Sequence, residues 1–132
     1  MTSHIATGGV HHFTLTVSDV GRAYDFYSEV LGFQKVAEYG PRILAHNGSC
    51  LIALSPAPET AGGSQGFDEN RVGLDHLSLA VENRNELERA AGILSERGIS
   101  HGEIVDLADF QIYVMMMRDP DNIQIELTAP HS

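Results

Sequence analysis

Apolar and polar residues alternate along two short stretches that resemble each other, His12–Val17 (HFTLTV) and His76–Val81 (HLSLAV). An alternation with a period of two predicts β-strands with one apolar and one polar face. Each stretch carries a histidine on its polar face, and the two histidines are 64 residues apart in a chain of 132. This spacing predicts a fold built from two similar halves.

A segment with helical periodicity follows each stretch and ends at a glycine. Ser18 or Asp19 is placed to cap the first helix, and Gly32 ends it; Asn83 caps the second, with a glutamate in capping-box spacing, and Gly98 ends it. The apolar stripes comprise Ala23, Phe26, Tyr27, Val30 and Leu31 in the first helix and Leu87, Ala90, Ala91 and Leu94 in the second.

Three further strands are expected after each helix, near residues 33–38, 43–46 and 50–54 and near residues 103–105, 110–117 and 123–128. The order βαβββ, found twice, predicts an α+β fold in which two tandem modules form a curved mixed sheet around a shared cleft. The histidines on the polar faces of the two repeat strands would point into it, which makes it a candidate metal cleft. We expect a single domain, 1–132, with a first module at 10–55, a Pro- and Gly-rich linker at 56–73 and a second module at 74–130.

Composition narrows the class of protein. The formal net charge of −10 argues against a protein that follows a nucleic-acid backbone or binds an anionic membrane surface, because both need a basic face. No apolar run approaches the roughly 20 residues of a membrane-spanning helix. The single cysteine, Cys50, cannot form an internal disulfide, so we expect a cytoplasmic protein and interpret Cys50 as a small buried apolar residue.

Three side chains are candidates for one metal site. Glu126 alternates with Ile125 and Leu127, so it lies on the polar face of the last strand, as His12 and His76 do on theirs. Two imidazoles and one carboxylate that converge in a cleft form a ligand set for one divalent metal, without distinguishing Fe, Mn, Ni and Zn.

At this point the chain resembles the vicinal oxygen chelate superfamily, which includes glyoxalase I, bleomycin-resistance proteins and extradiol dioxygenases. The resemblance covers about residues 10–130 and implies the glyoxalase/dioxygenase-like fold, metal binding by His12, His76 and Glu126, and a homodimer acting on a small-molecule substrate. The motifs that carry it are His12-x-x-Leu15-x-Val17-x-Asp19, Phe26-Tyr27 with Val30-Leu31-Gly32-Phe33, Gly73-x-x-His76, and Arg118-Asp119-Pro120-Asp121-Asn122 followed by Glu126.

The chain departs from two of these relatives at informative positions. Glyoxalase I-like enzymes carry a fourth, glutamate ligand where this chain has Ala53, and extradiol dioxygenases carry a tyrosine where it has Met116. The reaction therefore stays open between Lewis-acid lyase or isomerase chemistry and dioxygenase chemistry on a partly apolar substrate with vicinal oxygens.

The remaining residues of the expected substrate pocket are Thr14, Ser78, Ile112, Val114, Met116 and Gln124. The catalytic acid or base is unknown, with His46 and His101 as weak candidates. His11 is interpreted as structural, and the run Met115–Met117 as packing or a dimer contact.

Two other functions remain possible from the sequence. A bleomycin-resistance-type protein would sequester a drug or metabolite without catalysis, which the apolar pocket residues favour and the His-His-Glu set disfavours. A thiol transferase would need a basic pocket for an anionic substrate, and only Arg22, Lys35, Arg42, Arg71 and Arg118 could supply one.

Overall fold

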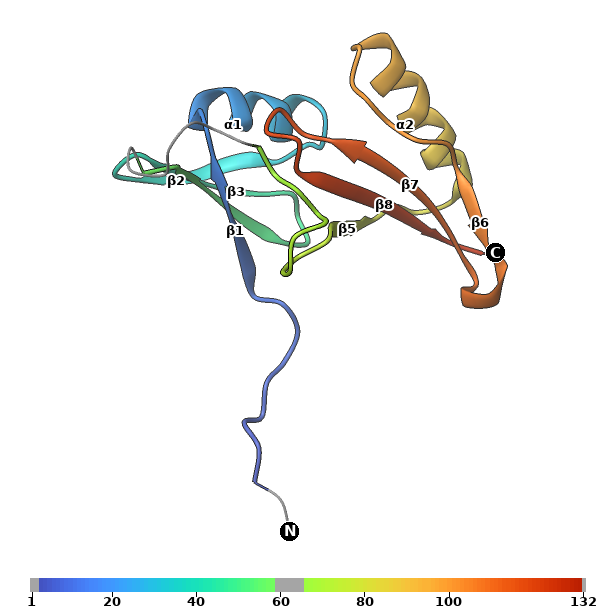
Figure 1. The fold of residues 1–132 in the computed structure, drawn as a ribbon, viewed down its shortest axis with the longest axis horizontal. Coiled ribbons are helices and arrows are strands. Elements are labelled where there is room, and N and C mark those ends of the chain that lie inside the picture. Colours follow the sequence, from blue (N-terminus) through green and yellow to red (C-terminus); the bar gives the residue numbers. More distant parts are fainter. Residues whose placement is uncertain (1–2, 59–65, 132) are drawn as a thin grey trace. The chain divides into compact units, whose positions relative to one another are not determined.

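The computed structural model describes residues 3–58 and 66–131, which form two compact units, Met1–Gly62 and Gly63–Ser132. Each unit is a βαβββ module with its own four-stranded mixed sheet (Figure 1). The predicted α+β class and the tandem repeat are confirmed. No helix in the described residues is long and apolar enough to cross a membrane.

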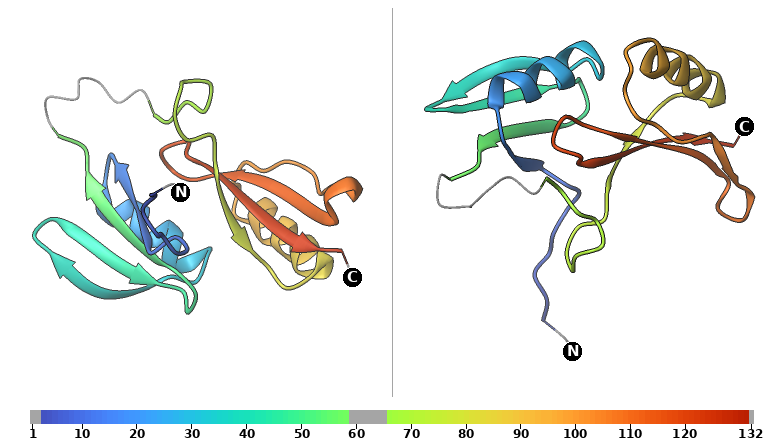
Figure 2. Two further views of the ribbon diagram at one scale, coloured as in Figure 1. Left: turned by 90° about the horizontal axis from the view of Figure 1, so that it is seen from below. Right: turned by 45° about the horizontal axis from the view of Figure 1, so that its top comes forward.

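The first unit contains β1 (His12–Val17), α1 (Val20–Glu29), β2 (Gln34–Tyr39), β3 (Arg42–His46) and β4 (Leu51–Pro56). Its sheet has the order β1-β4-β3-β2, in which β1 is parallel to β4 and the other pairs are antiparallel. The helix connects the parallel strands and lies along one face of the sheet (Figure 2), where it buries Ala23, Phe26 and Tyr27.

The second unit contains β5 (Leu77–Ala80), α2 (Arg84–Glu96), β6 (Val105–Leu107), the short 3-10 helix η2 (Ala108–Phe110), β7 (Ile112–Arg118) and β8 (Gln124–Pro130). Its strand order, β5-β8-β7-β6, repeats that of the first unit. Met115 and Met117 are buried on the face that α2 covers, together with Leu87 and Leu94 of the helix. This burial supports interpreting Met115 and Met117 as packing residues, whereas Met116 lies on the other face of the sheet and is half-buried.

Strand register shows how closely the two halves correspond. In the first sheet Thr14 pairs with Ala53, and in the second sheet Ser78 pairs with Glu126, at the equivalent point of the parallel strand pair. Paired residues share a face of the sheet. Ala53 therefore occupies the position in the first unit that Glu126 occupies in the second.

Both helices begin at the predicted caps. The Asp19 side chain accepts a hydrogen bond from the backbone of Arg22 at 3.0 Å, and the Asn83 side chain accepts one from the backbone of Glu86 at 3.0 Å. Each cap satisfies one of the backbone N–H groups that a helix leaves unpaired at its start. After each helix a glycine adopts a left-handed conformation, with φ of +76° at Gly32 and +69° at Gly98.

Part of the predicted 56–73 linker is bound to the second unit, while residues 59–65 lie outside the described residues. The backbone N–H of Phe67 donates to the carbonyl of Asp121 at 2.9 Å. The Arg118 guanidinium donates to both carboxylate oxygens of Glu69, at 2.6 and 2.9 Å. These hydrogen bonds lower the pKa of the Glu69 carboxyl to about 2. Residues 67–69 are thus fixed to the β7–β8 turn.

Candidate metal centre

His76 and Glu126 come together beside β5 and β8, two adjacent strands of the second sheet. His76 directly precedes β5, Glu126 lies on β8, and His76 Nε2 is 3.5 Å from Glu126 Oε1. The Glu126 side chain is 12% exposed and that of His76 is 32% exposed, so the pair is largely shielded yet still reachable. Both side chains lie on the face opposite α2, as the alternation predicts.

The orientation of the His76 ring is set by Asp75. His76 Nδ1 donates to Asp75 Oδ1 at 2.8 Å, because a carboxylate can only accept. Gln124 Nε2 donates to Asp75 Oδ1 at 3.0 Å and to the Asp75 carbonyl at 3.1 Å. The chain from Gln124 through Asp75 to His76 leaves Nε2 as the ring nitrogen that faces Glu126.

Glu126 is held by hydroxyl groups from the same face. Thr128 Oγ1 donates to Glu126 Oε1 at 3.0 Å, and the Ser78 and Thr128 hydroxyls are 2.5 Å apart. Metal-binding carboxylates in proteins are typically fixed by such hydrogen bonds from outside the ligand set.

The His76–Glu126 pair fits a divalent cation. Two ligand atoms that each lie about 2.1 Å from a tetrahedral ion are about 3.4 Å apart, close to the observed 3.5 Å between Nε2 and Oε1. Within the described part of the second unit, no third His, Cys, Asp or Glu side chain joins them in a group able to hold an ion. A complete site needs at least one further ligand.

His12, the third predicted ligand, begins β1 in the first unit. It is exposed and lies on the same face as Thr14, opposite the face that carries Phe13, Leu15 and Val17. Its Nδ1 lies 2.9 Å from Nδ1 of His11, and the two rings meet edge to face. The structure therefore brings two of the three predicted ligands together, and metal binding by His12, His76 and Glu126 stays a prediction.

Three apolar residues share the face that carries Glu126. Met116 pairs directly with Glu126, Val114 with Thr128, and Ile112 with Pro130 in the antiparallel β7–β8 pair. Val114 is buried, whereas Met116 and Ile112 are half-buried. An apolar surface thus borders the carboxylate, in the arrangement that the sequence predicts.

One family model matches most of the chain. Residues 9–127 match the family model described as the Glyoxalase/Bleomycin resistance protein/Dioxygenase superfamily. The chain belongs to this superfamily. The match spans both units and includes every predicted metal ligand.

Several individual proteins resemble the chain. A glyoxylase/bleomycin resistance protein/dioxygenase domain from Frankia sp. EAN1pec is 30% identical, with a TM-score of 0.79 over 95% of this chain and 93% of that chain. The catechol-2,3-dioxygenase of Bacillus subtilis (strain 168) is 29% identical over 98% of this chain, which spans only 44% of that enzyme. The fosfomycin resistance protein FosX from Listeria monocytogenes shares the fold, with a TM-score of 0.75 at 14% identity, covering 94% of each chain.

The two candidate catalytic histidines lie in different surroundings. His46 and His12 both pair with Leu51, so they share the face opposite α1. His46 Nδ1 accepts a hydrogen bond from the Gly48 backbone at 2.9 Å. A catalytic role for His46 stays a prediction.

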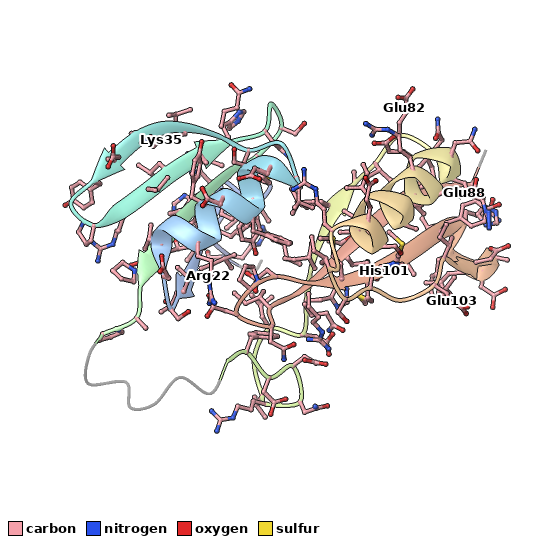
Figure 3. All side chains as sticks on the ribbon, turned by 90° about the horizontal axis from the view of Figure 1, so that it is seen from above. Arg22, Lys35, Glu82, Glu88, His101 and Glu103 are labelled. Atoms are coloured by element: carbon pink, nitrogen blue, oxygen red, sulfur yellow. The ribbon has the colours of Figure 1, made fainter. Side chains whose placement is uncertain are left out.

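His101 forms a bridge with Met117, which places it on the α2 side of the second sheet, away from Glu126. Figure 3 shows His101 beside α2. Its Nε2 is 2.8 Å from the Ser95 hydroxyl of α2, and its Nδ1 donates to the Gly102 carbonyl at 2.8 Å. With both ring nitrogens engaged, His101 fixes the chain to α2, and these contacts favour a structural role over catalysis.

Sequence reasoning missed two residues that contact the candidate ligands, Thr128 beside Glu126 and Asp75 beside His76. The position of Asp75 was the harder one to predict. Strand alternation would put Asp75 on the same face as Leu77 and Leu79, opposite His76, so it gave no reason to place the two side chains together. The available signal was positional, because Asp75 precedes His76 as His11 precedes His12 in the other copy of the repeat. Gln124, predicted as a pocket residue, uses its amide to hold Asp75.

Proposed function

We propose that the protein is a cytoplasmic, divalent-metal-dependent enzyme that acts on a small, partly apolar organic molecule with two neighbouring oxygens. His12, His76 and Glu126 would hold the metal, and two copies of the chain would form a homodimer. The observation that carries this proposal is the distance of 3.5 Å between His76 Nε2 and Glu126 Oε1. Hydrogen bonds with Asp75 and Thr128 hold the two side chains in this arrangement.

Each group has a defined task in this proposal. When bound, the metal supplies Lewis-acid stabilisation of an oxyanion or enolate-like state, or activates dioxygen if it is iron. Asp75 and Thr128 keep the ligand atoms of His76 and Glu126 in place without entering the ligand set. Met116 and Val114 offer contact to the apolar part of the substrate and limit the access of water to the carboxylate.

One observation favours dioxygenase chemistry, and another favours lyase or isomerase chemistry. The catechol-2,3-dioxygenase relative favours an aromatic diol, a molecule with two neighbouring oxygens on an apolar ring. Met116 stands where extradiol dioxygenases carry a tyrosine, and this difference favours isomerase or lyase chemistry over catechol cleavage.

A second candidate function is sequestration of an apolar drug or metabolite without catalysis. The apolar surface formed by Ile112, Val114 and Met116 favours it. It predicts that ligand binding continues after the metal is removed with a chelator, whereas the enzyme proposal predicts that binding of a vicinal diol is lost with the metal.

Metal stoichiometry tests the main proposal. The purified protein is loaded separately with Mn²⁺, Fe²⁺, Ni²⁺ or Zn²⁺, desalted and measured by elemental analysis beside His12→Ala, His76→Ala and Glu126→Gln. We expect about one equivalent per chain in the parent protein and substantial loss in all three variants. His4→Ala and Glu88→Gln, at exposed positions, are matched controls that should retain the metal. Full metal content in His76→Ala or Glu126→Gln would contradict the proposal.

A further inference from the structure

The residue that precedes each candidate histidine makes the same contact in both halves. Asp75 Oδ1 lies 2.8 Å from Nδ1 of His76, and His11 Nδ1 lies 2.9 Å from Nδ1 of His12. His11 and Asp75 occupy equivalent positions of the repeat, 64 residues apart. Two chemically different residues thus engage the same ring nitrogen at equivalent points of two separate units.

This contact decides which nitrogen of the ring is left for a cation. A neutral imidazole carries a proton on one nitrogen and a lone pair on the other, and a hydrogen bond donated by Nδ1 places the lone pair on Nε2. In the second unit Nε2 is the atom that faces Glu126, so the preferred nitrogen and the proposed ligand geometry agree.

Asp75 is itself held in place by Gln124, so its hydrogen bond can orient the His76 ring. Its side chain is 64% exposed, and an isolated surface contact of this kind contributes little. Gln124, however, donates to both the carboxylate and the backbone carbonyl of Asp75, and Gln124 belongs to the strand that carries Glu126. The carboxylate is therefore positioned relative to the strand that supplies the second ligand.

His11 can play the equivalent part in the first unit. The His11 and His12 rings are nearly perpendicular, at 80°, with centroids 5.1 Å apart. An Nδ1-to-Nδ1 distance of 2.9 Å requires one ring to donate and the other to accept. With His12 as the donor, its Nε2 carries the lone pair, as in His76.

We propose that Asp75 and His11 are a matched pair of positioning residues that direct Nε2 of His76 and His12 to the metal. This inference rests on the proposed function, because it takes both histidines as ligands. The new claim is that metal affinity depends on two residues that do not bind the metal themselves. One is a carboxylate, Asp75, and the other is an imidazole, His11. Groups in this position typically change metal affinity by about 10- to 100-fold when removed.

At each position one substitution removes the hydrogen-bond acceptor, and a second changes the residue but keeps an acceptor. Asp75→Ala removes the acceptor, whereas Asp75→Asn keeps an amide oxygen that accepts from Nδ1. His11→Phe keeps an aromatic ring without nitrogen, whereas His11→Asn restores an acceptor. Asp109→Ala and His4→Phe, at exposed positions, serve as matched controls.

The first readout is the dissociation constant for Mn²⁺, titrated into full-length protein and followed by the electron paramagnetic resonance signal of free Mn²⁺. The second is the ring tautomer of His76 and His12 in metal-free protein, measured by long-range ¹H–¹⁵N NMR at a pH where the rings are neutral. Asp75→Ala and His11→Phe should weaken Mn²⁺ binding about 10- to 100-fold and move the proton of the neighbouring ring toward Nε2. Asp75→Asn and His11→Asn should largely restore both values.

The outcomes distinguish this inference from the proposed function. If His76→Ala abolishes Mn²⁺ binding while Asp75→Ala and His11→Phe keep the parent affinity and tautomers, the positioning role is wrong and the ligand assignment stands. If only the Asp75 variants weaken binding, the matched pair is wrong. If the parent protein and His76→Ala bind Mn²⁺ alike, the ligand assignment fails, and the positioning role fails with it.

Discussion

Met116 lies directly opposite Glu126 across the antiparallel β7–β8 pair. Side chains paired in this way have Cβ atoms about 4.5–5.5 Å apart and interact across the strands. The apolar thioether thus borders the carboxylate without competing for it. A charge introduced at residue 116 should therefore change the metal affinity, and a change in the shape of its side chain should change substrate binding.

Met116→Lys should weaken metal binding while leaving the fold intact. An ammonium group beside Glu126 competes with the cation for the carboxylate, and a charge at this distance in partly buried surroundings is strong enough for a loss of at least about tenfold. The measurement is the Mn²⁺ dissociation constant. Met116→Leu, which conserves volume and adds no charge, is the matched control and should bind as the parent does. Unchanged affinity in the lysine variant would show that Glu126 does not hold the metal.

Ala53→Glu would introduce a carboxylate at the position of the first unit that corresponds to Glu126 in the second. Ala53 is buried, at 7% exposure, so an unpaired glutamate there should lower the melting temperature of the metal-free protein. Added Mn²⁺ should raise the melting temperature of the variant more than that of the parent protein, because the new carboxylate gains a partner. Ala53→Gln, which adds similar bulk without charge, should be destabilised but should show no larger response to Mn²⁺ than the parent. Equal metal responses of the glutamate variant and the parent would place residue 53 outside the centre.

The Arg118–Glu69 pair makes stability depend on pH in the acid range. The folded-state pKa of Glu69 is lowered to about 2 from an ordinary 4.5. The stabilisation is therefore fully present above pH 4.5 and is lost as pH falls toward 2. Urea unfolding of the parent protein and Glu69→Gln across this range should show a difference that shrinks with decreasing pH. A constant difference would mean that the ion pair is not the source of the stabilisation.

Leu87→Ala should destabilise the second unit by about 2–5 kcal/mol, because it removes a fully buried side chain from the contact between α2 and its sheet. Glu88→Ala, at the neighbouring exposed position of the same helix, should change the free energy of unfolding by less than about 0.5 kcal/mol. Both values come from urea unfolding followed by circular dichroism. Equal effects at the two positions would contradict the assigned inner face of α2.

Local patterns in the sequence were sufficient for the order of the helices and strands and for the faces of the strands that carry the candidate ligands. The strand expected near residues 103–105 instead spans Val105–Leu107, and the 3-10 helix Ala108–Phe110 was not predicted. Alternation placed His12, His76 and Glu126 on the faces opposite the helices, and the match of Thr14–Ala53 with Ser78–Glu126 followed from the repeat. Asn47-Gly48 is a dipeptide typical of two-residue hairpins. In the structure it belongs to a longer connection between His46 and Leu51, in which the Asn47 side chain accepts hydrogen bonds from the backbones of Ser49 and Cys50.

Contacts between residues far apart in sequence were not predictable in this way. The attachment of residues 67–69 depends on Arg118, about 50 positions away, and no periodicity in either segment encodes it. The contact between Asp75 and His76 depends on a side-chain rotamer fixed by Gln124, which strand alternation does not describe. His101 was a weak catalytic candidate from the sequence, and only its bridge to Met117 shows which face of the sheet it occupies.

Anomalous diffraction at the manganese absorption edge, from crystals of the Mn²⁺-loaded protein, tests the metal centre most directly. We expect a single strong peak about 2.0–2.3 Å from His12 Nε2, His76 Nε2 and a carboxylate oxygen of Glu126. A peak that lies away from any one of these three side chains, or that is bound through a histidine Nδ1, would contradict the proposed centre.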